Sequence, residues 1–112
     1  MKRVALYCRV ALLCQQTCDD QLRDLRQCCR TRGWADVREF ADEGISGTRE
    51  HRPALDKLLA EVKSGRVDVV MVATLDRLGR SLRHVVEVLE LFRDLGVEFI
   101  SLADDGLLGG VR

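Results

Sequence analysis

Proline, aromatic residues and long apolar runs are all scarce in this sequence. The 112 residues include one proline, Pro53, and only 4% are Phe, Trp or Tyr. Apolar runs such as Val69 to Ala73 are far shorter than the roughly 20 residues of a membrane-spanning helix. The first residues contain no apolar segment typical of a targeting peptide before Arg9. We therefore expect a soluble domain with no membrane contact.

The sequence also lacks the usual patterns of a disulfide framework or a zinc site. Its five cysteines do not form a C-x-x-C pair, and there are only two histidines. An odd number of cysteines favours reduced thiols over paired disulfides. We expect a cytoplasmic protein with no structural metal, in which the thiols pack as small apolar groups. The cysteines are Cys8, Cys14, Cys18, Cys28 and Cys29.

Net charge is absent as well, because 18 basic residues balance 18 acidic ones. A neutral protein has no general attraction for nucleic acid or membranes, so a polyanion would have to be held by a local cluster. Fifteen of the 18 basic residues are arginine. Arginine holds phosphate through a planar fork of donors, so this bias favours phosphate chemistry.

Short strand patterns alternate with helical ones along the chain. Residues 42–48 contain two glycines and a serine, which predicts a loop. Glycines 33, 65 and 96 follow the three helical patterns as C-terminal caps. This alternation predicts an α/β fold, a mainly parallel four-stranded sheet with helices on both faces. The predicted strands are 3–10, 37–41, 67–74 and 97–102, and the predicted helices are 17–32, 53–63 and 81–95. We assign residues 1–102 to one domain and 103–112 to a polar, glycine-containing tail.

The last helical pattern contains more apolar residues than one stripe requires. Val88 and Leu91 lie beside the main stripe. They either widen the core face, which we favour, or form a surface for a partner. The main stripe is predicted to contain Leu82, Val85, Val86, Leu89, Phe92 and Leu95.

Charged residues gather after the predicted strands, at the sheet edge where parallel α/β folds place their sites. Like charges at one edge repel unless an anion lies among them, and phosphate suits arginine best. A surface network of salt bridges is an equally good explanation of the same residues. The sequence lacks the glycine-rich nucleotide-binding motifs and the clustered carboxylates of metal nucleases. The residues in question are Arg9, Asp42, Arg52, Asp76, Arg77 and Arg80.

These segments together resemble the N-terminal catalytic domain of the serine site-specific recombinases, the resolvase and invertase family. The resemblance covers residues 3–102. It rests on Tyr7-Cys8-Arg9-Val10 with Gln15, Thr17-x-x-Asp20-Gln21-Leu22, Asp42-Glu43-Gly44-Ile45-Ser46-Gly47, Arg52-Pro53-Ala54-Leu55 and Leu75-Asp76-Arg77-Leu78-Gly79-Arg80-Ser81.

The resemblance implies DNA strand cleavage and exchange through a 5′-phosphoseryl intermediate, with no cofactor, because the covalent link stores the bond energy. The four arginines would surround the scissile phosphate, while Asp42 and Asp76 would orient them or help to move a proton. Ser46 would be an auxiliary contact, and Tyr7 and Gln15 would support the site. The implied partners are duplex DNA and further copies of the chain, as a dimer or tetramer. The four arginines are Arg9, Arg52, Arg77 and Arg80.

One position departs from the family pattern at its centre. The pattern reads Tyr-x-Arg-Val-Ser-Thr, whereas this sequence has Ala11 and Leu12 in place of the last two residues. Because a methyl group cannot attack phosphorus, we predict that the chain does not form the covalent intermediate. We also expect weak affinity for DNA, because no DNA-reading domain is recognisable in these residues. Two alternatives remain: a non-catalytic oligomerisation or regulatory module with the same fold, and an unrelated small-ligand α/β domain whose charges are structural.

Overall fold

The computed structural model describes residues 2–10, 18–43, 53–73 and 82–102, apart from the side chains of Val10 and Glu43. Strands and helices alternate strictly in these segments. The elements are β1 (Arg3–Val10), α1 (Cys18–Thr31), β2 (Asp36–Glu43), α2 (Pro53–Lys63), β3 (Val69–Val72), α3 (Leu82–Asp94) and β4 (Glu98–Ser101).

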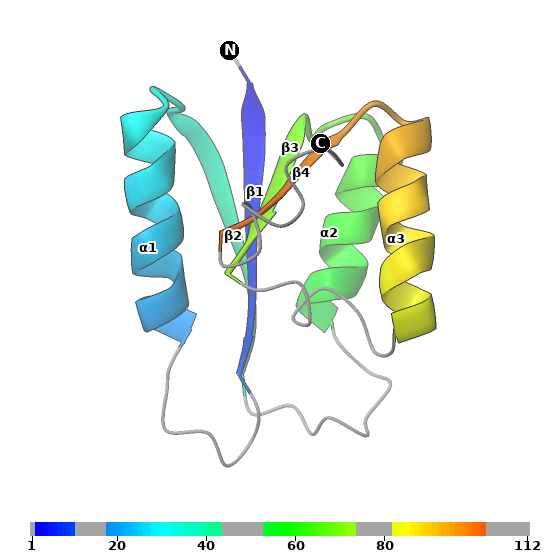
Figure 1. Cartoon of the computed structure of the whole chain (residues 1–112), viewed down its shortest axis with the longest axis horizontal. Coiled ribbons are helices and arrows are strands. Elements are labelled where there is room, and N and C mark those ends of the chain that lie inside the picture. Colours follow the sequence, from blue (N-terminus) through cyan, green and yellow to red (C-terminus); the bar gives the residue numbers. More distant parts are fainter. Residues whose placement is uncertain (1, 11–17, 44–52, 74–81, 103–112) are drawn as a thin grey trace.

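The four strands form one parallel sheet in the order β2-β1-β3-β4. Helix α1 covers one face of this sheet, and α2 and α3 cover the other (Figure 1). Strand β3 is buried at all four positions, as expected for a central strand covered on both faces. The predicted α/β fold, a parallel sheet with helices on both faces, is confirmed.

Each face of the sheet has its own core. Alternate residues of β1 enter opposite cores, because successive side chains of a strand point to opposite faces. Leu6 packs with α1, and Tyr7 packs with α2 and α3. The α1 side is rich in sulfur, and the Sγ atom of Cys29 lies 3.6 Å from the Sδ atom of Met71. Burial raises the pKa of the Cys29 thiol.

The three helices end in the same way, at the predicted glycines. Gly33, Gly65 and Gly96 have φ angles of 75°, 76° and 72°, a left-handed conformation that only glycine adopts without strain. After α1, the amide of Trp34 donates to the carbonyl of Cys29 at 2.9 Å, which is the long bond of a Schellman motif. Equivalent bonds follow α2 and α3. Each helix therefore turns back into the sheet through the same short connection.

Strand β2 is longer than predicted, and the prediction that Asp42 and Glu43 begin a loop was wrong. Both belong to β2, where they are in register with Arg9 and Val10 of β1. Parallel pairing with the long strand β1 overrides the weak strand preference of acidic residues. Strand β3 is shorter than predicted, because its ladder begins at Val69 and ends at Val72.

The buried stripe of α3 also differs from the prediction. Its buried members are Val85, Val88 and Phe92, which recur at helical spacing. The prediction that Leu82 and Val86 belong to the core stripe was wrong, because they are 80% and 46% exposed. Val88 is a core residue, so the wider-core explanation is confirmed at this position. Leu95, also predicted on the stripe, follows the helix and is exposed.

The amino ends of β1 and β3 are joined by one arginine and one aspartate. The carboxylate of Asp68 accepts the backbone N–H of Arg3 at 2.8 Å and its Nε and Nη2 groups at 3.1 and 3.2 Å. These donors, all from Arg3, lower the pKa of Asp68 to about 2. The ion pair is more than one-third exposed on both sides, so its stabilising effect is small.

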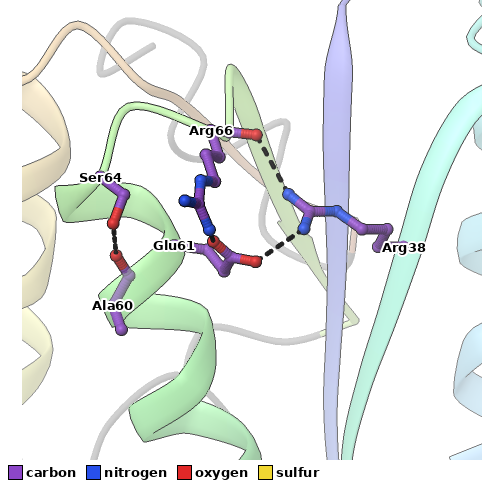
Figure 2. Close-up of polar contacts among 5 residues, drawn as sticks. All are labelled: Arg38, Ala60, Glu61, Ser64 and Arg66. Atoms are coloured by element: carbon purple, nitrogen blue, oxygen red, sulfur yellow. Dashed lines mark hydrogen bonds and ion pairs between the residues drawn. The ribbon is translucent and has the colours of Figure 1, made fainter.

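A second ionic cluster joins β2 to α2 and the turn that follows it (Figure 2). Arg38 donates to Glu61 at 2.8 Å and to the carbonyl of Arg66 at 3.0 Å. The guanidinium of Arg66 donates to the other oxygen of Glu61 at 3.2 Å. Hydrogen bonds from both arginines lower the pKa of Glu61.

None of the helices in the described segments has the length and the apolar composition that a membrane span requires.

Candidate active site

Three of the predicted site residues lie in the described part of the chain: Tyr7, Arg9 and Asp42. They come from two strands that are adjacent in the sheet. The remaining predictions fall outside the described residues. They are Ala11, Gln15, Ser46, Arg52, Asp76, Arg77 and Arg80.

The parallel register of β1 and β2 places these three side chains together. Arg9 is the register partner of Asp42, and Tyr7 lies two residues before Arg9 on the same strand. Residues two apart on a strand share a face, so all three face α2. The shared location of Tyr7 and Phe40 in the core beneath α2 and α3 agrees with this arrangement. The group lies at the carboxyl end of both strands, where the sequence predicts the site.

Asp42 is 3% exposed and accepts three hydrogen bonds. The hydroxyl of Tyr7 donates to its Oδ2 atom at 2.8 Å. The backbone N–H groups of Ala54 and Leu55, in the first turn of α2, donate to Oδ1 and Oδ2 at 3.0 and 3.1 Å. These amides have no partner within the helix, so Asp42 caps α2 and its charge is stabilised by the helix dipole. The carboxylate thus links β1, β2 and α2.

Arg9 has a different environment from the other arginines described above. Its side chain is half-buried, yet its Nε and Nη1 atoms are fully buried and have no hydrogen-bond partner among the residues that the structure describes. No ion pair joins it to Asp42 within the described part of the chain. Buried polar atoms are rarely left without a partner, because the unmade bond is costly. Such atoms at the carboxyl edge of a parallel sheet are typical of groups that bind a ligand.

Gln21 of α1 is a further polar residue at this edge that the sequence reasoning did not assign to the site. It is 7% exposed, and its Nε2 group donates to the backbone carbonyl of Arg9 at 3.2 Å. Its Oε1 atom is buried without a partner. The signal was present in the sequence: Gln21 lies three residues after Cys18 and four before Leu25, on the buried stripe of the helix. A polar residue on such a stripe indicates a specific contact.

Metal-binding groups are not concentrated at this edge. Among the residues that the structure describes, no three His, Cys, Asp or Glu side chains gather closely enough to hold a metal ion. Of the residues in the described segments, those at this edge provide one guanidinium, one capped carboxylate, a phenol and an amide. Of these, the guanidinium carries the donors that suit an anionic oxygen.

Comparison with known proteins identifies the family. The sequence profile of the family described as "Resolvase, N terminal domain" matches residues 4–108, nearly the whole chain. The chain belongs to this family. The resolvase N-terminal domain is the catalytic domain of the serine recombinases, so the family predicted from the sequence motifs is confirmed.

Relatives with curated names include resolvases and invertases. The chain is 38% identical over 69 residues to the transposon Tn917 resolvase of Enterococcus faecalis, a match that covers 62% of this chain and 36% of the relative. It is 44% identical over 63 residues to the DNA-invertase of Escherichia phage P1, covering 56% of this chain and 33% of the invertase. The matched part of the chain thus spans about a third of the length of these two relatives.

Solved structures agree with the fold. The N-terminal catalytic domain of TP901-1 integrase superposes with a TM-score of 0.81 at 33% identity, covering 92% of this chain and 78% of the other. A resolvase family site-specific recombinase from Streptococcus pneumoniae superposes with a TM-score of 0.79 at 27% identity, covering 93% and 74%. Serine recombinase catalytic domains therefore share this sheet and its helices.

Proposed function

We propose that this resolvase-family domain binds a DNA phosphate through its arginines but does not cleave the strand, because Ala11 stands at the nucleophile position. In the family pattern, a serine at this position forms a bond to phosphorus while the 3′ oxygen leaves. Alanine has no oxygen to form that bond. Loss of the nucleophile lowers the rate on the order of a million-fold in one well-studied serine hydrolase.

The observation that carries the proposal is the pair of buried, unpartnered nitrogen atoms of Arg9, Nε and Nη1. The Nε–H and Nη1–H groups lie on different edges of the guanidinium, and each can donate to an anionic oxygen such as that of a phosphate. The positive charge persists at any working pH, because arginine does not deprotonate in proteins. A phosphate bound at either edge would satisfy a buried donor and offset part of the cost of burying it.

The family resemblance supplies the rest of the proposed site. Arg52, Arg77 and Arg80 would add charge around the same phosphate, with Asp76 orienting them and Ser46 as an auxiliary contact. The four guanidinium groups would stabilise the negative charge that develops on a phosphate during transfer, so metal would not be required. The arginines would therefore support phosphate binding in this chain, and cleavage only where a hydroxyl is present.

A covalent-trapping experiment tests the proposal. The chain would be joined to a DNA-reading domain of known target and incubated with a nicked duplex that traps the protein–DNA link. We expect no adduct from the chain with Ala11 and a phosphoserine adduct from the Ala11→Ser variant. An adduct formed with Ala11 in place would disprove the proposed loss of cleavage. Absence of an adduct from Ala11→Ser would show that more than the hydroxyl has been lost.

Phosphate binding is tested separately with the unmodified chain. We expect inorganic phosphate to shift the side-chain N–H resonances of Arg9 in NMR spectra at low ionic strength. Arg9→Gln should abolish most of the binding, whereas Arg3→Gln, which changes the ion pair with Asp68 at the opposite end of β1, should not alter it. Equal binding by Arg9→Gln and the unchanged chain would contradict the proposed site.

Subunit association without cleavage is a second candidate function, and α3 favours it. Leu82 and Val86 lie one helical turn apart and are both exposed, at 80% and 46%. Burying each of these side chains would contribute about 1.5–3 kcal/mol to a contact between copies. We expect the double variant Leu82→Ser/Val86→Ser to remain folded and to shift sedimentation toward the monomer. A monomeric wild-type chain at high concentration would remove this candidate.

A further inference from the structure

Arg9 and Asp42 are neighbours of opposite charge that do not pair. They are register partners on adjacent strands and leave the sheet on the same face. An arginine beside a buried carboxylate ordinarily forms a bidentate ion pair with it. Here the guanidinium keeps two buried nitrogen atoms without a partner. Other hydrogen-bond donors must therefore hold the Asp42 carboxylate away from Arg9.

The carboxylate is held by donors from two other elements. Two are backbone N–H groups of α2, and these are fixed by the helix. The third is the hydroxyl of Tyr7, which is fully buried and donates to Oδ2 at 2.8 Å. Oδ2 therefore receives both the hydroxyl and the amide of Leu55, which fills its two lone-pair directions. The phenol is the only one of these three donors that a side-chain substitution can remove.

We infer that Tyr7 is a positioning residue whose hydroxyl holds Asp42 against α2 and so keeps the Arg9 guanidinium available for phosphate. The inference rests on the proposed function, in which Arg9 binds phosphate. Tyr7 does not touch the phosphate itself in this arrangement. Its effect comes from the competition between two anions, the Asp42 carboxylate and the bound phosphate, for the same donors of Arg9.

Tyr7→Phe provides the direct test, because it removes the hydroxyl and keeps the ring that fills the core. One lone pair of Oδ2 then becomes free, and among the described residues Arg9, the register partner of Asp42, can donate to it. A hydrogen bond between charged groups changes an equilibrium by about tenfold or more. We expect the dissociation constant for inorganic phosphate to rise by about tenfold at low ionic strength. The Arg9 Nε–H group should also exchange more slowly with solvent in the absence of phosphate.

The Asp42→Asn background separates this effect from a packing defect. A neutral amide cannot form an ion pair with Arg9, so Tyr7→Phe should leave phosphate affinity unchanged in that background. If Tyr7 acted only through packing, Tyr7→Phe would weaken binding equally in both backgrounds. Asp42→Asn by itself keeps the tyrosine and should bind phosphate at least as tightly as wild type. A folded Asp42→Asn chain that binds several-fold more weakly would show that Asp42 assists Arg9 and would overturn the inference.

The remaining outcomes distinguish this inference from the function on which it rests. Wild-type binding that requires Arg9 but is unchanged by Tyr7→Phe overturns the role of Tyr7 and leaves the proposed function standing. Wild-type binding that is insensitive to Arg9→Gln overturns both. Amide spectra of each variant show whether the fold is intact. If Tyr7→Phe does not fold, the phosphate affinity of Asp42→Asn alone tests whether Asp42 competes with phosphate for Arg9.

Discussion

The arginines at the two ends of the parallel sheet differ in whether their side chains have hydrogen-bond partners. At the amino end, Arg3 is bound to Asp68 through its backbone and its guanidinium, and Arg38 is bound to Glu61. At the carboxyl end, two side-chain nitrogen atoms of Arg9 are buried and have no partner among the described residues. The nearest acid in register, Asp42, is committed to Tyr7 and α2.

We interpret this difference as one of role. Arg3 and Arg38 support the fold through their ion pairs, whereas the unpartnered donors of Arg9 can bind a ligand. Exposed ion pairs at the amino end add little stability individually, but no described side-chain nitrogen of Arg3 or Arg38 is buried without a partner. An unpartnered buried guanidinium lowers stability, and proteins retain such costs mainly at functional sites. The contrast favours phosphate binding over a purely structural salt-bridge network, at least for Arg9. Three predictions test it, from the largest effect on stability to the smallest.

Asp42→Ala should lower the free energy of unfolding by about 3 kcal/mol, because it removes a helix cap and leaves the buried Tyr7 hydroxyl without this acceptor. Urea denaturation measures the loss. Asp42→Asn, which keeps the shape and one oxygen, is the matched control and should cost about 1 kcal/mol. A loss below 1 kcal/mol for Asp42→Ala would show that the carboxylate is not a structural link.

Arg9→Met should raise the free energy of unfolding by about 1 kcal/mol, because it replaces an unpartnered buried charge with an apolar chain of similar length. The same change at Arg3 removes satisfied hydrogen bonds and should lower stability. Both are measured by urea denaturation at neutral pH without phosphate. A destabilising Arg9→Met substitution would mean that Arg9 has an internal partner, and the contrast between the two ends would disappear.

Asp68→Asn should cost less than about 1 kcal/mol at pH 7, because the pair with Arg3 is half-exposed and screened. The folded state holds the pKa of Asp68 at about 2, below the ordinary 3.8. The stabilisation is therefore present above pH 4 and is lost as the pH falls toward 2. The free energy of unfolding, measured between pH 7 and 2.5, should therefore depend less steeply on pH for Asp68→Asn than for the wild-type chain. Identical slopes would contradict the pairing.

Much of the fold could be predicted from the sequence, because it depends on local patterns. The periodic apolar residues of α1 and α2, the glycines that end the helices, and the unbroken run of β3 each predict their own element. The errors arose where the register decided the outcome. Asp42 looks like the start of a loop until its pairing with Arg9 is known. Leu82 and Val86 look like core until the position of α3 over the sheet is fixed.

The candidate site was predictable in its composition but not in its contacts. Motif resemblance identified Tyr7, Arg9 and Asp42, and the structure brings them to one edge. Nothing in the sequence indicates that Asp42 is held by Tyr7 and the amides of α2 while Arg9 keeps open donors, because this depends on the relative position of two strands and a helix. The roles proposed for Ala11 and for the residues of segments 44–52 and 74–81 remain predictions.

The cysteines of α1 allow the packing of this helix against the sheet to be followed by thiol labelling. Cys28 and Cys29 are adjacent in sequence, but the first is half-buried and the second is 2% exposed and lies against Met71. A thiol reagent should modify Cys28 directly and reach Cys29 only when α1 lifts from the sheet. Because Gln21 attaches this same helix to the backbone of Arg9, the labelling rate of one sulfur atom would report how firmly the neighbouring edge is held.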